Sequence, residues 1–168
     1  MTTSNKIPSN VAWYLSGFVD GEGSFNISLR KKSDYRIGWQ PVLSFNVSQR
    51  ERTLLDLMKS YYHCGIIKRR RDGLHSYDVT NPSDLKRKII PFFDQYLFLS
   101  KRKQTNYLLF KEAVDLMLSK EHLELEGFKR LLDIRESINE GKGRTRKYSK
   151  QDVLKLIESP ETIRQEAS

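Results

Sequence analysis

Hydrophobic and polar residues alternate strictly in two neighbouring segments, residues 25–29 and 43–48. A period of two is typical of a strand that buries one face and exposes the other. The segment between them, residues 33–38, has the composition of a connection. The two segments are therefore predicted to pair as a hairpin with an apolar inner face and a polar, increasingly basic outer face.

Apolar residues at helical spacing precede this hairpin, over residues 11–19, where Ser9 or Asn10 is expected to cap a helix and Gly21 and Gly23 to end it. The other predicted elements are a helix at 53–62, a second hairpin at 66–80 turning at Asp72-Gly73, a helix from Asn81 interrupted at Pro91, and helices at about 102–119, 124–139 and 150–158. The order α-β-β-α-β-β-α with additional C-terminal helices predicts an α+β fold. Its four-stranded antiparallel sheet has helices on one face and an uncovered polar face.

Length and composition fit one folded, basic domain: 168 residues, 38% hydrophobic, with a net charge of +9. We expect a core over about residues 9–120 and a C-terminal helical extension over about 121–168. Residues 1–111 carry 19 basic and 9 acidic side chains, whereas residues 112–140 carry 4 and 8. Such polarity favours a face that binds a polyanion and a solvated back. The single cysteine, Cys64, excludes an internal disulfide and fits a reducing compartment.

Two carboxylates, Asp20 and Glu22, lie where the first predicted helix ends. Acidic groups there face the negative end of the helix dipole and cost about 0.3 to 1 kcal/mol each. A divalent cation would turn that cost into attraction, because Mg²⁺ prefers carboxylate and carbonyl oxygens; a solvated turn is the alternative. Gly17 and Gly21, four residues apart, leave a stripe without side chains that lets another backbone approach closely.

The segment Leu15–Gly23, LSGFVDGEG, resembles the signature of the LAGLIDADG homing endonucleases, and the order of elements is similar to the core of that family. Gln49, residues 101–106 and residues 142–150 also resemble the members that carry a single signature. Ser16 replaces Ala in the signature, and Glu22 replaces the more common Asp.

The resemblance implies a site-specific, double-strand DNA endonuclease that cuts a long pseudo-palindromic target and promotes intron mobility. Two signature helices pack together in this family, and this chain contains one, so it implies a homodimer through Leu15–Gly23. It also implies two or three Mg²⁺ ions per dimer, with Mn²⁺ as a substitute.

The resemblance assigns roles to individual residues. Glu22 and the Gly21 carbonyl bind metal, Gln49 orients the attacking water, and Lys101 and Arg52 stabilise phosphate charge. Asp20 ranks lower among the catalytic candidates, because holding the helix ends together suits it better.

Candidate DNA-binding residues follow from the outer face of the two hairpins. The first hairpin contributes Asn26, Ser28, Arg30, Lys32, Gln40, Ser44 and Asn46. The second contributes Lys68, Arg69 and Arg71, with Ser76 and Asp78 on the same outer side. Alternating donors on a twisted ribbon suit the major groove. A late basic patch that includes Lys142 and Arg144 is expected to clamp the DNA backbone.

Two other functions remain open. One is a maturase-like protein that uses the same basic surface to bind an intron RNA, and the other is a DNA-binding regulator that does not cleave. No secretory leader and no apolar run of about 18 residues is evident, so an intracellular location without membrane insertion is expected. Bacterial cytoplasm and an organelle, chloroplast or mitochondrion, are not distinguished.

Overall fold

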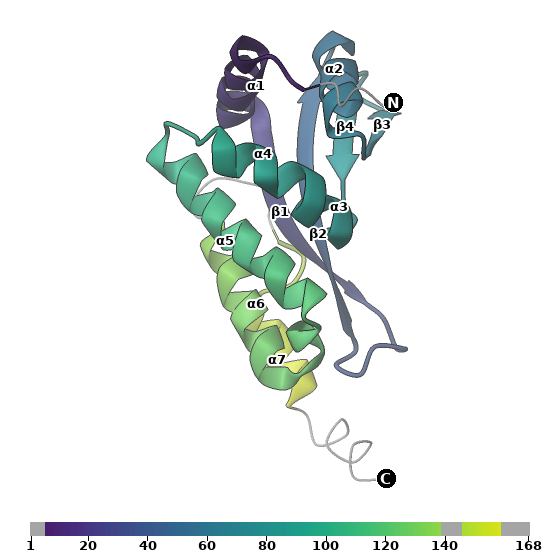
Figure 1. Ribbon diagram of the computed structural model, residues 1–168. Helices are drawn as coiled ribbons and strands as arrows, with labels where there is room; N and C mark the ends of the chain where they lie inside the picture. Colours follow the sequence, from purple (N-terminus) through teal and green to yellow (C-terminus); the bar gives the residue numbers. More distant parts are fainter. Residues whose placement is uncertain (1–5, 139–145, 159–168) are drawn as a thin grey trace, which may run out of the picture.

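The structure is a computed structural model that describes residues 6–138 and 146–158 (Figure 1). Its strands are β1 (Gly23–Lys31), β2 (Trp39–Gln49), β3 (Ile66–Arg69) and β4 (His75–Val79). Its helices are α1 (Ser9–Glu22), α2 (Thr53–Tyr62), α3 (Pro82–Asp84), α4 (Ile90–Gln95), α5 (Lys101–Leu118), α6 (Leu125–Ser137) and α7 (Lys150–Ile157), with a π-helical turn η1 (Leu85–Ile89) and a 3₁₀ turn η2 (Glu121–Leu123). The predicted α+β order is confirmed.

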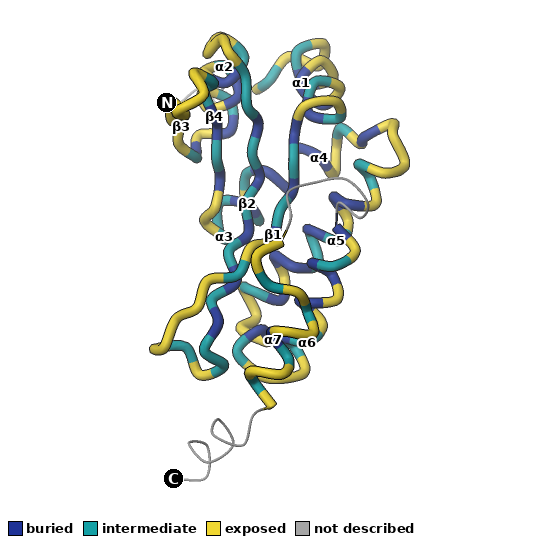
Figure 2. Tube along the Cα trace, turned by 180° about the vertical axis from the view of Figure 1, so that it is seen from behind, coloured by how far each residue is buried: buried dark blue, intermediate teal, exposed yellow. Residues whose placement is uncertain are grey.

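The four strands form one antiparallel sheet in the order β1-β2-β4-β3. Phe25 pairs with Phe45 and Asn26 with Ser44, so apolar and polar side chains separate onto opposite faces. In Figure 1, α4 and α5 lie over the near side of the sheet, and the view from behind in Figure 2 shows the strands uncovered. The sheet therefore has the one covered face and the one open face that the alternation predicted.

The main core lies between the inner face of the sheet and the helices. Its centre is aromatic: the Phe25 and Phe45 rings stack at 5.3 Å, and Phe93 stacks on Phe98 at 4.7 Å. A second, smaller cluster, called here the distal cluster, lies at the far end of the β1–β2 hairpin and consists of Trp39, Phe128, Leu132 and Val153. Two separate apolar clusters thus hold the two ends of the first hairpin.

The junction between α1 and β1 depends on a glycine. A Cβ on Gly23 would lie 2.5 Å from Cγ1 of Val19 and 2.8 Å from its carbonyl oxygen. Contacts this short are not tolerated, so only glycine lets the strand leave the helix end directly. The chain consequently passes from the acidic end of α1 into the sheet without a loop.

Three local predictions are corrected or confirmed by the helix boundaries. Neither Ser9 nor Asn10 caps α1, because the helix begins at Ser9 and its N-cap residue, Pro8, makes no side-chain capping bond. Gly21 lies inside α1 rather than ending it. The break expected near Pro91 is confirmed: η1 interrupts the helical run, and Pro91 lies in the first turn of α4.

Over the described residues, no helix combines the length and the hydropathy that crossing a membrane requires.

Candidate nucleic-acid interface and acidic turn

The end of α1 is tied to the start of α5 through Asp20. Its carboxylate accepts hydrogen bonds from the backbone N of Ser100, at 3.0 Å, and from the Ser100 hydroxyl. Ser100 is itself the N-cap of α5, where its Oγ accepts from the backbone N of Lys103. Lys101, the first residue of α5, directly follows this contact in the chain, and its catalytic role stays a prediction.

Glu22 differs from Asp20, because it is exposed at the last position of α1. Its carboxylate and the nearby backbone carbonyls are hard oxygen donors, the chemistry that Mg²⁺ prefers. Within the described parts of the chain, no group of three or more His, Cys, Asp or Glu side chains could hold a metal ion. One chain thus offers donors that fit Mg²⁺ in kind but supplies only part of a coordination shell.

Lys103 is a charged group at this turn; the sequence placed it in a basic cluster, residues 101–103, beside the site but assigned it no role of its own. Its ammonium donates a hydrogen bond to the backbone carbonyl of Gly23. Burial lowers the pKa of Lys103, while the negative charges of Asp20 and Glu22 oppose that shift. A half-buried cation therefore sits against the acidic turn. The sequence offered one clue. Lys103 is three residues after Ser100, the N-cap of α5, and therefore lies in the first turn of that helix.

Gln49 and Arg52 have different surroundings. Gln49 is the last residue of β2, two positions beyond Val47, which pairs with Gly23, so it flanks the acidic turn. Arg52 lies outside the strand, and its Nη2 donates to Oδ1 of Asp56 at 2.9 Å in an exposed ion pair. The described contacts thus place Gln49 near the turn and engage Arg52 with α2.

Most of the predicted DNA-binding residues share the open face of the sheet. The strand registers put them on the outer side, and none belongs to either apolar cluster. They are Asn26, Ser28, Arg30, Gln40, Ser44, Asn46, Lys68, Ser76 and Asp78. This face is dominated by neutral hydrogen-bonding groups, with few charges among them.

Three other DNA-binding candidates, Arg69, Lys32 and Arg71, are not on the open-face positions of the strands, and their contact with DNA stays a prediction. Arg69 pairs with His75 on the inner-face register, opposite to Lys68, because β3 keeps strict alternation. Lys32 follows the end of β1 and forms an ion pair with Asp34 at 3.5 Å.

Arg71 lies in the turn beyond β3, since the backbone bond from Arg70 N to Leu74 O closes the hairpin there. Arg70 was missed: its Nη1 donates to Oγ of Ser48 on the outer face, at 3.3 Å. Alternation counted from Lys68 would have found it.

Two further groups are already engaged within the chain. Ser76 is 7% exposed and donates to Asp78, which also pairs with Lys68 at 3.2 Å. In the late basic patch, Arg146 bonds Glu136 and backbone carbonyls of α6, and Lys150 bonds Asp133. Lys142 and Arg144 lie outside the described residues. Of the described residues in this patch, Arg146 and Lys150 are thus engaged within the chain.

One face of α1 is exposed and has no partner in the described chain. Trp13 and Tyr14 are 51% and 57% exposed, although the Trp13 ring also contacts Tyr96 edge-on. Gly17 and Gly21 continue this face, and a Cβ at either position would meet no atom within 4 Å. Nothing in the described part of the chain requires glycine at either position.

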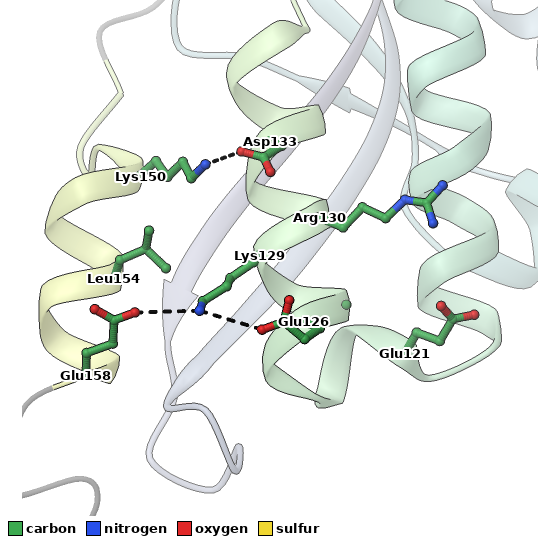
Figure 3. Close-up of a pocket in the computed structure, with 9 residues that line it drawn as sticks. Glu121, Glu126, Lys129, Arg130, Asp133, Lys150, Leu154 and Glu158 are labelled. Atoms are coloured by element: carbon green, nitrogen blue, oxygen red, sulfur yellow. Dashed lines mark hydrogen bonds and ion pairs between the residues drawn. The ribbon is translucent and has the colours of Figure 1, made fainter.

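A hollow of about 600 Å³ lies between α6 and α7 (Figure 3). Its charged lining is paired internally: Lys150 bonds Asp133, and Lys129 lies 3.7 Å from Glu126 and 3.6 Å from Glu158. Opposite charges that neutralise one another suit neither a polyanion nor a cation. The ion pairs in this hollow therefore connect α6 and α7, and the hollow is not a candidate catalytic site.

Comparison with known proteins identifies the class to which this fold and turn belong. A model of the LAGLIDADG endonuclease family matches residues 15–114, which include the acidic turn, the whole sheet and most of α5. The chain belongs to the LAGLIDADG endonuclease family.

Among curated proteins, the chain is 33% identical over 145 residues to probable intron-encoded endonuclease 2 of Neurospora crassa, covering 84% of this chain and 32% of that protein. It is 30% identical to the DNA endonuclease I-CeuI of Chlamydomonas moewusii, covering 72% of this chain and 58% of that protein. The chain spans about a third or less of the length of this Neurospora protein and of two other intron-encoded curated relatives.

Solved structures agree on the fold. I-SmaMI, a LAGLIDADG homing endonuclease bound to cleaved DNA, superposes with a TM-score of 0.74 at 36% identity, over 79% of this chain and 45% of that one. The archaeal intron-encoded homing endonuclease I-Vdi141I, complexed with DNA, has a TM-score of 0.81 at 29% identity, over 88% of this chain and 94% of that one. The predicted family and fold class are confirmed.

Proposed function

We propose that this chain is one subunit of a site-specific DNA endonuclease that cuts both strands of a long pseudo-palindromic target and promotes intron mobility. The observation that carries the proposal is the position of the acidic turn, which lies at one end of an open sheet face lined by amide, hydroxyl and guanidinium groups. Hydrogen-bonding groups at alternate strand positions can read base edges in a major groove. The turn then lies against the phosphate backbone.

In this proposal each catalytic residue of the chain has a distinct role in hydrolysis. Gln49 orients the attacking water through its amide, and Lys101 places its ammonium against the phosphate oxygens. The Glu22 carboxylate and the Gly21 carbonyl would hold Mg²⁺, which would supply Lewis-acid stabilisation of the developing phosphate charge. I-SmaMI has been solved on its uncleaved DNA target in the presence of calcium ions, which supports a divalent-metal site.

The second half of the active site comes from a second copy of the chain. The exposed aromatic and glycine face of α1 supports a C2 dimer, since Gly17 and Gly21 allow two helices to approach closely. A dyad along α1 brings two acidic turns together and aligns two open sheets. One metal-binding turn per strand of DNA follows from that symmetry.

The experiment is selection of cleaved sites from a randomised duplex library with Mg²⁺, with Mn²⁺, with Ca²⁺ and with EDTA. We expect cuts in both strands at one related set of sequences with Mg²⁺ or Mn²⁺, and none with EDTA. Glu22→Gln should abolish cutting, whereas Glu126→Gln, an exposed glutamate of α6, should not. Metal-independent cutting, or none at any sequence, would contradict the proposal; binding without cutting would point to the DNA-binding regulator, and selective retention of intron RNA to the maturase.

A further inference from the structure

The β1–β2 hairpin extends well beyond the rest of the sheet. Only Phe45–Gln49 of β2 pair with β4, so residues 39–44 and their partners in β1 form a two-stranded ribbon. This ribbon carries Ser28, Arg30 and Gln40, three of the outer-face residues. A two-stranded ribbon is marginally stable by itself in water. Something else must hold its far end in place.

The distal cluster supplies that support from the C-terminal helices. Trp39 is 4% exposed, and Phe128, Leu132 and Val153 are fully buried around it. The Trp39 ring also meets the edge of Tyr148, with centroids 4.8 Å apart. These contacts join the start of β2 to α6, to α7 and to the segment that precedes α7.

Polar contacts reinforce the same junction. Nζ of Lys31 lies 5.7 Å from the Trp39 ring centroid and 5.5 Å from that of Tyr148. At the tip, Nη1 of Arg36 lies 3.0 Å from Oε1 of Glu124. The C-terminal part of the chain therefore contacts the ribbon on its inner face and at its tip, while the outer face of the ribbon stays open.

α7 depends on the same contacts. It has eight residues, too few to be stable as an isolated helix, although Ser149 and Asp152 form a capping box. Arg135 of α6 donates to the backbone carbonyl of Tyr148 at 2.8 Å, and Lys129 and Lys150 bridge the two helices (Figure 3). α6, α7 and the ribbon thus form one mutually supporting unit.

We propose that α7 acts as a clamp on the DNA-reading ribbon, and that Trp39 and Val153 are positioning residues for base discrimination in the outer part of each half-site. The inference rests on the proposed function, because the outer face must meet DNA. Discrimination by hydrogen bonds needs side chains held at defined positions, and a loosened ribbon has to be ordered again at each encounter. The acidic turn lies at the opposite end of β1, so the clamp acts on recognition and leaves the chemistry alone.

The first test uses the DNA-free protein. Val153→Ala opens a cavity in the distal cluster, and we expect hydrogen exchange at the ribbon amides, residues 28–42, to accelerate about tenfold. Amides of the main core, such as those of Phe25 and Phe45, should exchange unchanged. Leu156→Ala is the matched control, since Leu156 lies on the same helix and is 48% exposed. Equal exchange in both variants overturns the clamp, whatever the protein does with DNA.

The second test measures cleavage of targets that carry every single base substitution. With Val153→Ala we expect discrimination to fall about tenfold at the outer positions of each half-site and to stay the same at the central positions. Retained outer discrimination, or a uniform loss over all positions, overturns the assignment. Tyr148→Ala, at the half-exposed rim of the cluster, gives the same comparison if Val153→Ala does not fold. If the wild-type chain cuts no target, the proposed function fails, while the exchange experiment still decides whether α7 holds the ribbon.

Discussion

Asp20 and Glu22 lie two residues apart at the end of α1 but have different surroundings. Asp20 is engaged by the backbone and the hydroxyl of Ser100, so it joins two helices. Glu22 is exposed at the helix end, with the Lys103 ammonium close enough to sense its charge. A structural role suits the first carboxylate and a ligand role suits the second.

Substituting Asp20 is expected to change stability, whereas substituting Glu22 is expected to change cleavage. Asp20→Ala should lower the free energy of unfolding by about 1 kcal/mol, because it removes two hydrogen bonds to a charged acceptor in a partly solvated site. Glu22→Gln should leave stability within about 0.5 kcal/mol of the wild type and abolish cleavage. Urea unfolding at pH 7 and a metal-dependent cleavage assay measure the two effects. A large loss of stability with Glu22→Gln would assign both acids to the scaffold.

Asp94 provides a prediction of pH dependence away from the acidic turn. Hydrogen bonds from Lys111 and Tyr107 lower the pKa of Asp94 below its usual 3.8 and outweigh the opposing effect of burial. A lowered folded-state pKa means that this stabilisation is present above about pH 4 and is lost as the pH falls through the folded-state value. Asp94→Asn should therefore cost roughly 0.5 kcal/mol at pH 7, after screening by solvent, and almost nothing at pH 2. Urea unfolding of both proteins from pH 2 to pH 7 tests it; a difference that persists at pH 2 would contradict it.

Some residues of the site could be predicted from the sequence and others could not. Glu22 and Gln49 stand at recognisable positions of a family pattern, and the turn and the strand end lie together as that pattern requires. Arg70 was missed, and Lys103 was assigned no role of its own, because their contacts are with Ser48 and Gly23, which are distant in sequence. A sequence shows where the charged residues are, but it does not show which distant residues they contact.

At the scale of the element, α1 is a helix that carries glycine where its own chain has no need of it. Glycine in a helix interior is less favourable than alanine by roughly 0.5 to 1 kcal/mol. The space around Gly17 and Gly21 is open in the described chain, so this cost has no compensation within it. A close helix partner on the exposed side of α1 would provide one.

Gly17→Ala should therefore have opposite effects on the subunit and on the dimer. The added methyl raises helix propensity, and we expect the dissociated subunit to gain about 0.5 kcal/mol of unfolding free energy. The same methyl holds two α1 helices apart, so the dimer should dissociate at least about tenfold more readily, a change of roughly 1.4 kcal/mol. Sedimentation over a range of concentrations measures the dimer, with Gln151→Ala on exposed α7 as the control. Unchanged dimerisation would exclude α1 as the interface.

Alternation predicted β1, β2 and the face of each residue, because one buried face imposes a strict period of two. Prediction failed in β3, which is only four residues long, where the tight turn leaves Arg71 outside the strand. The clamp of α7 on the ribbon was not predictable either. Periodicity shows that Trp39 and Val153 are apolar but not that they belong to the same buried cluster.

At the scale of the whole molecule, the net charge is +9, but its basic side chains have different surroundings. Some form ion pairs within the chain, and others lie on the open face of the sheet. Several basic residues that composition would assign to DNA are already paired with carboxylates, including Lys86 with Asp115 and Lys111 with Asp94. On the open face, Arg30 stands among neutral donors and acceptors, while Lys68 pairs with Asp78 at 3.2 Å. That arrangement suits a surface on which a few charges hold phosphate and many neutral groups read bases.

The salt dependence of DNA binding tests this division of roles. Each phosphate that is neutralised contributes about −0.9 to the slope of log affinity against log salt concentration, so a dimer that loses one such contact per subunit should lose about 1.8. Arg30→Gln should thus make the slope shallower and weaken binding to all sequences alike. Asn46→Ala, which removes a neutral amide from the centre of the open face, should weaken binding to the selected target and leave the slope unchanged. Fluorescence anisotropy on selected and scrambled duplexes from 50 to 300 mM salt, roughly the range in which such slopes are measured, separates the two. If Asn46→Ala changed the slope, or if Arg30→Gln altered only the preference among sequences, the open face would not be divided between phosphate and base contacts in this way.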